Sequence, residues 1–212
     1  MVMRFLKFSL FLIVLALVFH NWTARQVLSL YLRWALGTPV QMESPRVDFL
    51  GTKVDFREVV IYNPSTVPPG LLAHASLIHL DLVTASLQDG HMRFKIVEVV
   101  ISDLKVTRFR DRSINLFALK IMQPGHSQLI ASKSPTIDQF LLTLERGSFE
   151  DDSAAKPYVS RQPVIFNHKQ EYLKVRTLED MVKIISWEAL KRLRLEKLGA
   201  GILDKIKADL EG

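Results

Sequence analysis

The side chains that could do chemistry in this chain are six histidines and a short acidic run. The histidines, at positions 20, 74, 79, 91, 126 and 168, show none of the spacings that bind zinc. His74 and His79 are five residues apart, and in a strand an odd separation puts two side chains on opposite faces. Each is therefore expected to be a strand surface residue rather than a metal ligand.

The acidic run, Glu150 to Asp152, follows Gly147 in an expected turn. No calcium-loop pattern surrounds it, so we expect a solvated turn rather than a cation site. The absence of cysteine excludes disulfides, thiolate metal sites and a cysteine nucleophile. No G-x-S-x-G, Walker or dinucleotide motif occurs. We therefore expect no catalytic residue, no metal, no cofactor and no enzymatic activity.

The length of 212 residues allows one medium domain and an anchor, and the 48% hydrophobic content excludes wholesale disorder. The net charge of +6 is uneven, because no acidic residue precedes Glu43 while Arg4, Lys7, Arg25 and Arg33 lie on either side of the apolar stretch Phe8 to Phe19. Basic residues beside an apolar segment typically meet anionic lipid headgroups. No arginine-rich run or helix-turn-helix pattern favours nucleic acid, which we do not expect as a partner.

The apolar run, about Phe5 to Trp22, predicts an uncleaved transmembrane anchor over residues 1–23. As a helix it spans roughly 27 Å, close to the thickness of the hydrocarbon core. A cleaved signal peptide is the rival interpretation, but Trp22 lies where a cleavage site near Ala24 needs a small side chain. The basic residues at the start predict that the N-terminus stays in the cytoplasm and that the chain after Trp22 lies on the opposite side of the membrane.

Residues 24–37 are expected to form a juxtamembrane amphipathic helix that ends at Gly37 and Pro39. Whether its apolar stripe contacts the membrane or the following sheet stays open. The stripe consists of Val27, Leu28, Tyr31, Leu32 and Leu36.

Residues 38–168 alternate apolar and polar side chains, which predicts a twisted antiparallel sheet and a mainly β fold with flanking helices (α+β). The phase of the alternation shifts at Arg57–Glu58, which indicates a bulge. Proline-containing connections follow at Asn63-Pro64 and at Pro68-Pro69-Gly70.

The order of these features resembles the N-terminal module of AsmA-like proteins of Gram-negative envelopes. Besides the anchor, the resemblance rests on Asn63-Pro64 closing a strand, Ser86-Leu87 before Gly90, Asn115-Leu116 after a long strand, and Gly147 in a return strand. It covers roughly Phe5 to Asp152. Members of the family are inner-membrane proteins that project into the periplasm, act in outer-membrane homeostasis and, when long, resemble lipid carriers with an apolar groove. Most are far longer than this chain.

The resemblance implies a single-pass inner-membrane protein whose periplasmic β domain binds or passes the acyl chains of membrane lipids. The alternatives are an anchored scaffold that binds an envelope protein or another copy of itself, and a closed β-sandwich like that of desiccation-associated proteins. The candidate residues for lining an apolar groove are Val54, Phe56, Ile78, Leu80, Leu82, Ile96, Ile101, Phe140 and Leu142.

Residues 169–212 predict a C-terminal segment of amphipathic helices. Thr177 and Asp180 have the spacing of a capping box, and an apolar stripe begins at Met181. A helix here could cover the open face of the sheet, or it could bind a partner or a second copy.

Overall fold

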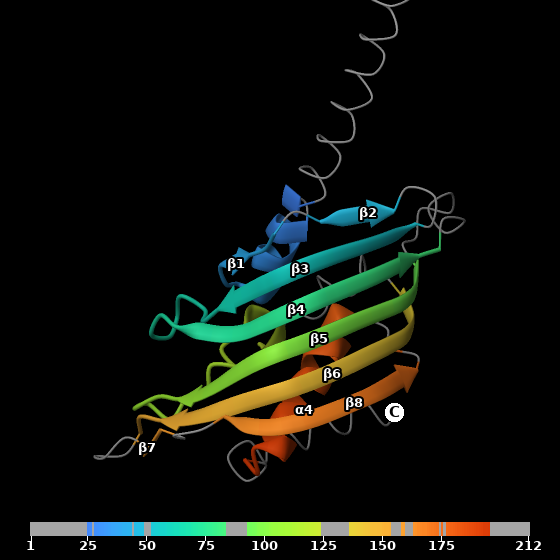
Figure 1. The fold of residues 1–212 in the computed structure, drawn as a ribbon. Helices are drawn as coiled ribbons and strands as arrows, with labels where there is room; N and C mark the ends of the chain where they lie inside the picture. Colours follow the sequence, from blue (N-terminus) through green and yellow to red (C-terminus); the bar gives the residue numbers. More distant parts are fainter. Residues whose placement is uncertain are drawn as a thin grey trace, which may run out of the picture.

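The computed structural model describes residues 25–26, 28–43, 45–48, 52–83, 93–123, 136–153, 158–159, 163–173, 175 and 177–195. They form one eight-stranded sheet with helices on one side, which confirms a mainly β, α+β fold (Figure 1). β1 and β2 both pair with β3, then β4, β5 and β6 follow, and β7 and β8 both pair with β6. The elements are β1 (Val40–Gln41), β2 (Arg46–Asp48), β3 (Lys53–Tyr62), β4 (Leu71–Leu82), β5 (Arg93–Arg108), η1 (Lys120–Met122), β6 (Thr136–Asp151), β7 (Tyr158–Val159), β8 (Val164–Leu173) and α4 (Leu178–Arg192).

The expectation of a wholly antiparallel sheet is wrong for one pair of strands. β5 and β6 are parallel, with Val97 opposite Phe140 and Ile101 opposite Leu144. Two parallel neighbours require the chain to cross back to its starting end, which takes a dozen or more residues. The connection over residues 109–135 is long enough to do this, and its first part contains η1.

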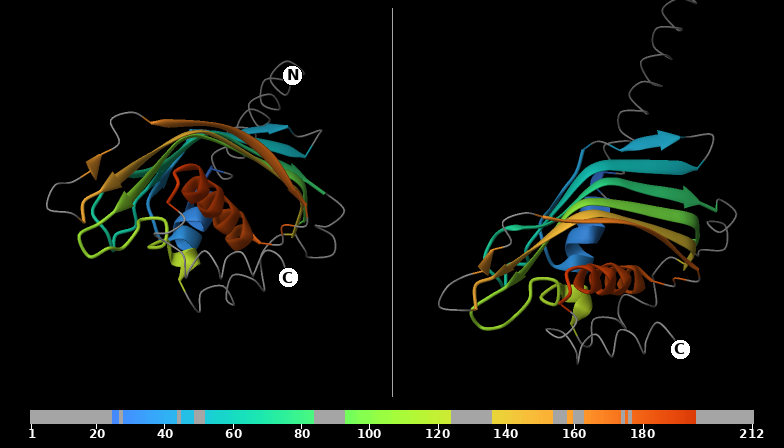
Figure 2. Two further views of the ribbon diagram at one scale, coloured as in Figure 1. Left: turned by 90° about the horizontal axis from the view of Figure 1, so that it is seen from below. Right: turned by 60° about the horizontal axis from the view of Figure 1, so that its bottom comes forward.

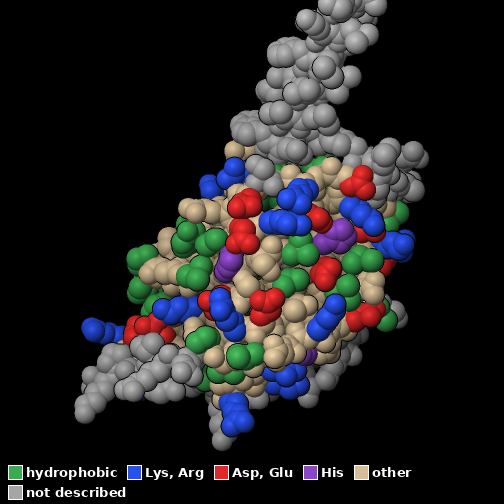
Figure 3. All heavy atoms as spheres, viewed as in Figure 1, with side chains coloured by type: hydrophobic (Ala, Val, Ile, Leu, Met, Phe, Trp, Pro, Cys, Tyr) green, Lys and Arg blue, Asp and Glu red, His purple; other side chains and the backbone are tan. Residues whose placement is uncertain are grey.

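The sheet is curved, and the helices lie on its concave side (Figure 2). Side chains that are opposite each other on paired strands share a face, so the register places Phe56, Ile78, Val99 and Leu142 in one row on the concave side. The convex side carries interspersed acidic, basic and histidine side chains (Figure 3). The concave face therefore holds the core, and the convex face is the polar surface of the domain.

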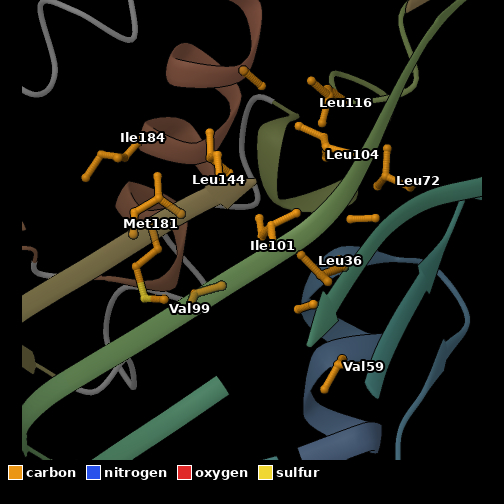
Figure 4. Close-up of a cluster of buried hydrophobic side chains, with 14 of the residues drawn as sticks. Leu36, Val59, Leu72, Val99, Ile101, Leu104, Leu116, Leu144, Met181 and Ile184 are labelled. Carbon is orange, nitrogen blue, oxygen red and sulfur yellow. The ribbon is translucent and has the colours of Figure 1, made fainter. Parts of the chain in front are cut away.

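Helix α4 packs on the concave face. Met181 and Ile184 join Val99, Ile101 and Leu144 in one buried apolar cluster (Figure 4). The expected capping box is present, since Thr177 Oγ1 accepts from the Asp180 N–H and Asp180 Oδ2 accepts from the Thr177 N–H. Of the two roles considered for the tail, covering the sheet is the one that α4 performs.

The N-terminal helix, residues 28–36, also packs on the sheet through most of its predicted stripe. Leu32 and Leu36 are buried in the core, and Leu28 and Tyr31 are partly buried against it. The helix ends as expected at Gly37, whose backbone has a φ of 69° that favours glycine.

The expected anchor, residues 1–23, lies outside the described residues, as does the end of the tail from residue 196. No helix within the described part of the chain is long and apolar enough to cross a bilayer. β8 continues to Leu173, past the expected end of the β domain at residue 168. The sequence places this boundary too early because β8 is mostly exposed, with its buried side chains limited to Phe166 and His168.

Candidate functional site

The concave face contains eight of the nine residues predicted to line an apolar groove, and four of these belong to its closed core. Phe56, Ile101, Phe140 and Leu142 are each no more than 4% exposed. They share a cluster with residues of α4 and of the N-terminal helix. In the middle of the sheet the apolar face is therefore covered by the protein's own helices.

The other four remain partly exposed at one end of the concave face. Val54, Ile78 and Leu80 are packed against the core without being part of it, and Leu82 is also partly exposed. The register explains their grouping, because Val54 is opposite Leu80 and Leu82 is opposite Phe94. Together they make an apolar area, here called the apolar end, that continues the core toward the surface.

The ninth residue, Ile96, lies on the other side of the sheet. It is opposite Asp81 on β4 and Gln139 on β6, whereas Val97 beside it is buried in the core. The phase of β5 thus shifts between Phe94, which packs on the core, and the buried Val97. Ile96 cannot contribute to a concave apolar site.

A buried polar cluster joins α4 to β8. His168 and Glu188 are 7% and 5% exposed, and their Nε2 and Oε2 atoms are 3.3 Å apart. Arg192 donates to His168 Nδ1 at 2.7 Å, and its Nε lies 3.8 Å from Glu188 Oε2. Because Nδ1 accepts this hydrogen bond, the proton of the neutral imidazole is assigned to Nε2, on the side of the carboxylate. Tyr172 completes the cluster from β8.

Burial sets the protonation states in this cluster. It lowers the pKa of His168, and the neighbouring charge of Arg192 lowers it further, so the neutral imidazole is favoured. Burial also raises the pKa of Tyr172, with a further rise from the Glu188 carboxylate, so the phenol keeps its proton. The cluster therefore pairs the Glu188 carboxylate with the Arg192 guanidinium. The two groups from β8, His168 and Tyr172, are neutral.

The cluster is better suited to holding α4 in place than to catalysis. The Ser186 hydroxyl is fully buried on the same helix and has no hydrogen-bond partner among the described residues. It is therefore not paired with His168 as an activated nucleophile would be. Sequence reasoning missed the cluster, although a glutamate among the apolar residues of α4 was a usable signal.

His74 and His79 lie on the same, convex face, so the expectation of opposite faces is wrong. The pairing of β4 with β5 shifts register on both sides of Ala75, which restores the phase between the two histidines. His74 Nε2 is 2.7 Å from Glu58 Oε2, and His79 Nδ1 is 2.5 Å from Asp55 Oδ1. Within the described ranges no group of three or more histidine or acidic residues could hold a metal ion.

The first two residues of the acidic run, Glu150 and Asp151, belong to β6 rather than to a free turn, and Asp152 follows the strand. Glu150 Oε2 lies 2.5 Å from Lys105 Nζ, and Asp151 Oδ2 lies 3.6 Å from Arg108 Nη1. Both basic residues belong to the neighbouring strand β5. A hydrogen bond from Ser153 lowers the pKa of Asp151. These carboxylates thus compensate basic residues of the neighbouring strand.

Three comparisons with known proteins gave no match to this chain: one with protein-family models, one with curated proteins and one with solved structures.

Proposed function

We propose that this chain is a membrane-anchored envelope protein of the AsmA-like type, in which the apolar end of the concave face binds a lipid acyl chain. The observation that carries the proposal is the partial exposure of Val54, Ile78, Leu80 and Leu82 beside a closed apolar core. An acyl chain laid on these side chains gains about 0.8 kcal/mol per buried CH₂. Binding is passive, and the protein is not an enzyme.

The sequence supports the same proposal independently. The apolar segment from Phe5 to Trp22 would tether the domain to the inner membrane, with the N-terminus in the cytoplasm and the β domain in the periplasm. The N-terminal helix follows this segment closely in the chain, which keeps the sheet near the lipid surface. The anchored domain therefore stays close to the membrane lipids that it would bind.

Binding is favoured over passage because of α4. A path for lipid along the whole concave face would need the row of Phe140 and Leu142 to be open, and both are fully buried. In this proposal one acyl chain docks at the apolar end and stops where the packed core begins. The alternative role of an anchored scaffold rests on a different feature, the outer edge of β8, which no described strand pairs with.

The test is photo-crosslinking of the full chain in vesicles that contain a phospholipid with a photoactivatable acyl chain. Mass spectrometry of the digested protein should find lipid attached within residues 71–82, which form β4, as well as within the apolar N-terminal segment. The N-terminal segment is the internal positive control, since a membrane anchor contacts acyl chains in any case. Crosslinks confined to residues 1–23 would overturn the proposal.

A further inference from the structure

Among the described strands, β8 forms one edge of the sheet, and its outer side is unpaired. β8 pairs with β6 along its whole length, and no other described strand lies beside it. An unpaired strand edge presents a row of backbone N–H and C=O groups that can pair with another strand. The positive φ of Asn167, 44°, interrupts the regular backbone, so the edge available for pairing begins at His168.

The side chains along this edge are arranged symmetrically about Gln170. Lys169 and Glu171, both exposed, are on either side of it and point to the convex face. His168 and Tyr172 come next, on the concave face. If a second β8 runs antiparallel to the first with Gln170 opposite Gln170, each Lys169 is opposite a Glu171. The edge is thus complementary in charge to itself.

We propose that two copies of this chain pair through β8, antiparallel and with the two-fold axis at Gln170. Opposite charges directly across from each other stabilise a strand pair, and like charges destabilise it. The symmetry forms the Lys169–Glu171 pair twice.

The pairing extends the curved sheet without turning it over. A two-fold axis perpendicular to the sheet keeps both concave faces on the same side, so the two helical layers lie side by side. The two N-terminal helices lie at the far ends of the joined sheet, because each precedes β1 at the opposite edge from β8. This interface depends only on β8 and is independent of acyl-chain binding at the apolar end.

Charge exchange tests the register of the pair. In the full chain in detergent, K169E places two acidic residues opposite each other at both ends of the pair, and the dimer association constant should fall about tenfold or more. E171K should have the same effect with the opposite sign of charge. The double variant K169E/E171K restores the complementarity, and its association constant should return to within about twofold of the original. Equal dimer formation by all four proteins would overturn the proposal.

A cysteine crosslink tests the position of the axis, and the chain is suited to it because it has no cysteine. Gln170→Cys should form a disulfide-linked dimer on mild oxidation, since the two sulfurs face each other across the axis. Arg57→Cys, exposed on β3, is the matched control and should remain monomeric. If Gln170→Cys crosslinks no faster than Arg57→Cys, or crosslinks only to a different protein, a second copy is not the occupant of this edge.

Discussion

The side-chain amide of Asn115 donates a hydrogen bond to Oδ1 of Asn63 at 3.1 Å, although the two residues are 52 positions apart. Asn115 is fully buried, and its four hydrogen-bonding positions are used. Its Oδ1 accepts from the N–H groups of Thr107 and Leu116, and its Nδ2 also donates to the Lys105 carbonyl. Asn63-Pro64 and Asn115-Leu116 are two of the dipeptides that carry the resemblance to AsmA-like proteins, and here they hold one junction together.

Substituting Asn115 with alanine should destabilise the domain by about 2–4 kcal/mol, because it leaves several buried polar groups without partners. Urea unfolding followed by circular dichroism measures the change. Gln123→Ala is the control, since that side chain is exposed and makes one long hydrogen bond of 3.4 Å. A loss for Asn115→Ala no larger than for the control would show that the network does not contribute to stability.

Gly147 should not tolerate alanine. A Cβ at this position would lie 2.5 Å from Cζ of Phe166 on the neighbouring strand, closer than real Cβ atoms approach. The expected cost of Gly147→Ala is about 1–3 kcal/mol in the free energy of unfolding, since Phe166 must leave its packed position. Phe166→Leu in the same chain should recover part of this loss. If the double variant is as unstable as the sum of the two single changes, the two side chains do not compete for this space.

The features that could be predicted from the sequence are those that depend on a few neighbouring residues. The capping box at Thr177 and Asp180 and the end of the N-terminal helix at Gly37 follow from hydrogen-bonding groups a few residues apart. The irregular backbone at Glu58, with a φ of 48°, was likewise visible as a shift in alternation. Each of these features depends only on near neighbours in the chain.

Features that depend on distant neighbours were not recoverable in this way. Alternation of side chains is the same in parallel and antiparallel strands, so the pairing of β5 with β6 left no mark on the sequence. The second half of β8, from Lys169, is predicted as part of the helical tail because an edge strand has few buried positions. The shared face of His74 and His79 requires the register shifts beside Ala75, which arise from pairing with β5.

The N-terminal cap of α4 should contribute about 1 kcal/mol to the free energy of unfolding. Thr177→Ala removes the side-chain acceptor for the Asp180 N–H, at 3.1 Å, and leaves one helix donor unpaired. Thr177→Ser keeps the hydroxyl and should keep nearly all of the stability. Thermal unfolding of the two variants distinguishes a cap effect from a packing effect. Equal melting temperatures would argue against the capping box as a contributor.

The stability of the domain should fall in mild acid because of His168. Burial and Arg192 lower the pKa of this imidazole in the folded protein below its ordinary value of 6.5. Below about pH 6.5 the folded state therefore binds fewer protons than the unfolded state. The contribution of the neutral His168 to the free energy of unfolding is complete above about pH 6.5 and is lost as the pH falls through the lowered pKa. The charged groups near the imidazole are Arg192, Lys191 and Glu188, and only the last opposes this shift.

His168→Gln removes the titrating group and should flatten the pH dependence. The measurement is the free energy of unfolding by urea at several pH values between about 5 and 7.5. The original protein should lose stability more steeply than the variant as the pH is lowered, and subtracting the two curves removes the other titrating groups. Parallel curves would mean that His168 titrates alike in the folded and unfolded states.

Acyl-chain binding at the apolar end should depend on which face of the sheet is altered. Leu80→Gln places an amide among the partly exposed apolar side chains beside Val54, and the yield of lipid crosslinked to β4 should fall about tenfold. Ile96→Gln is the matched control, because Ile96 is also partly exposed and belongs to the next strand but lies on the convex face. The control should keep its full crosslinking yield. If both variants lose lipid equally, the loss reflects the stability of the sheet, and if neither does, the acyl chain binds elsewhere.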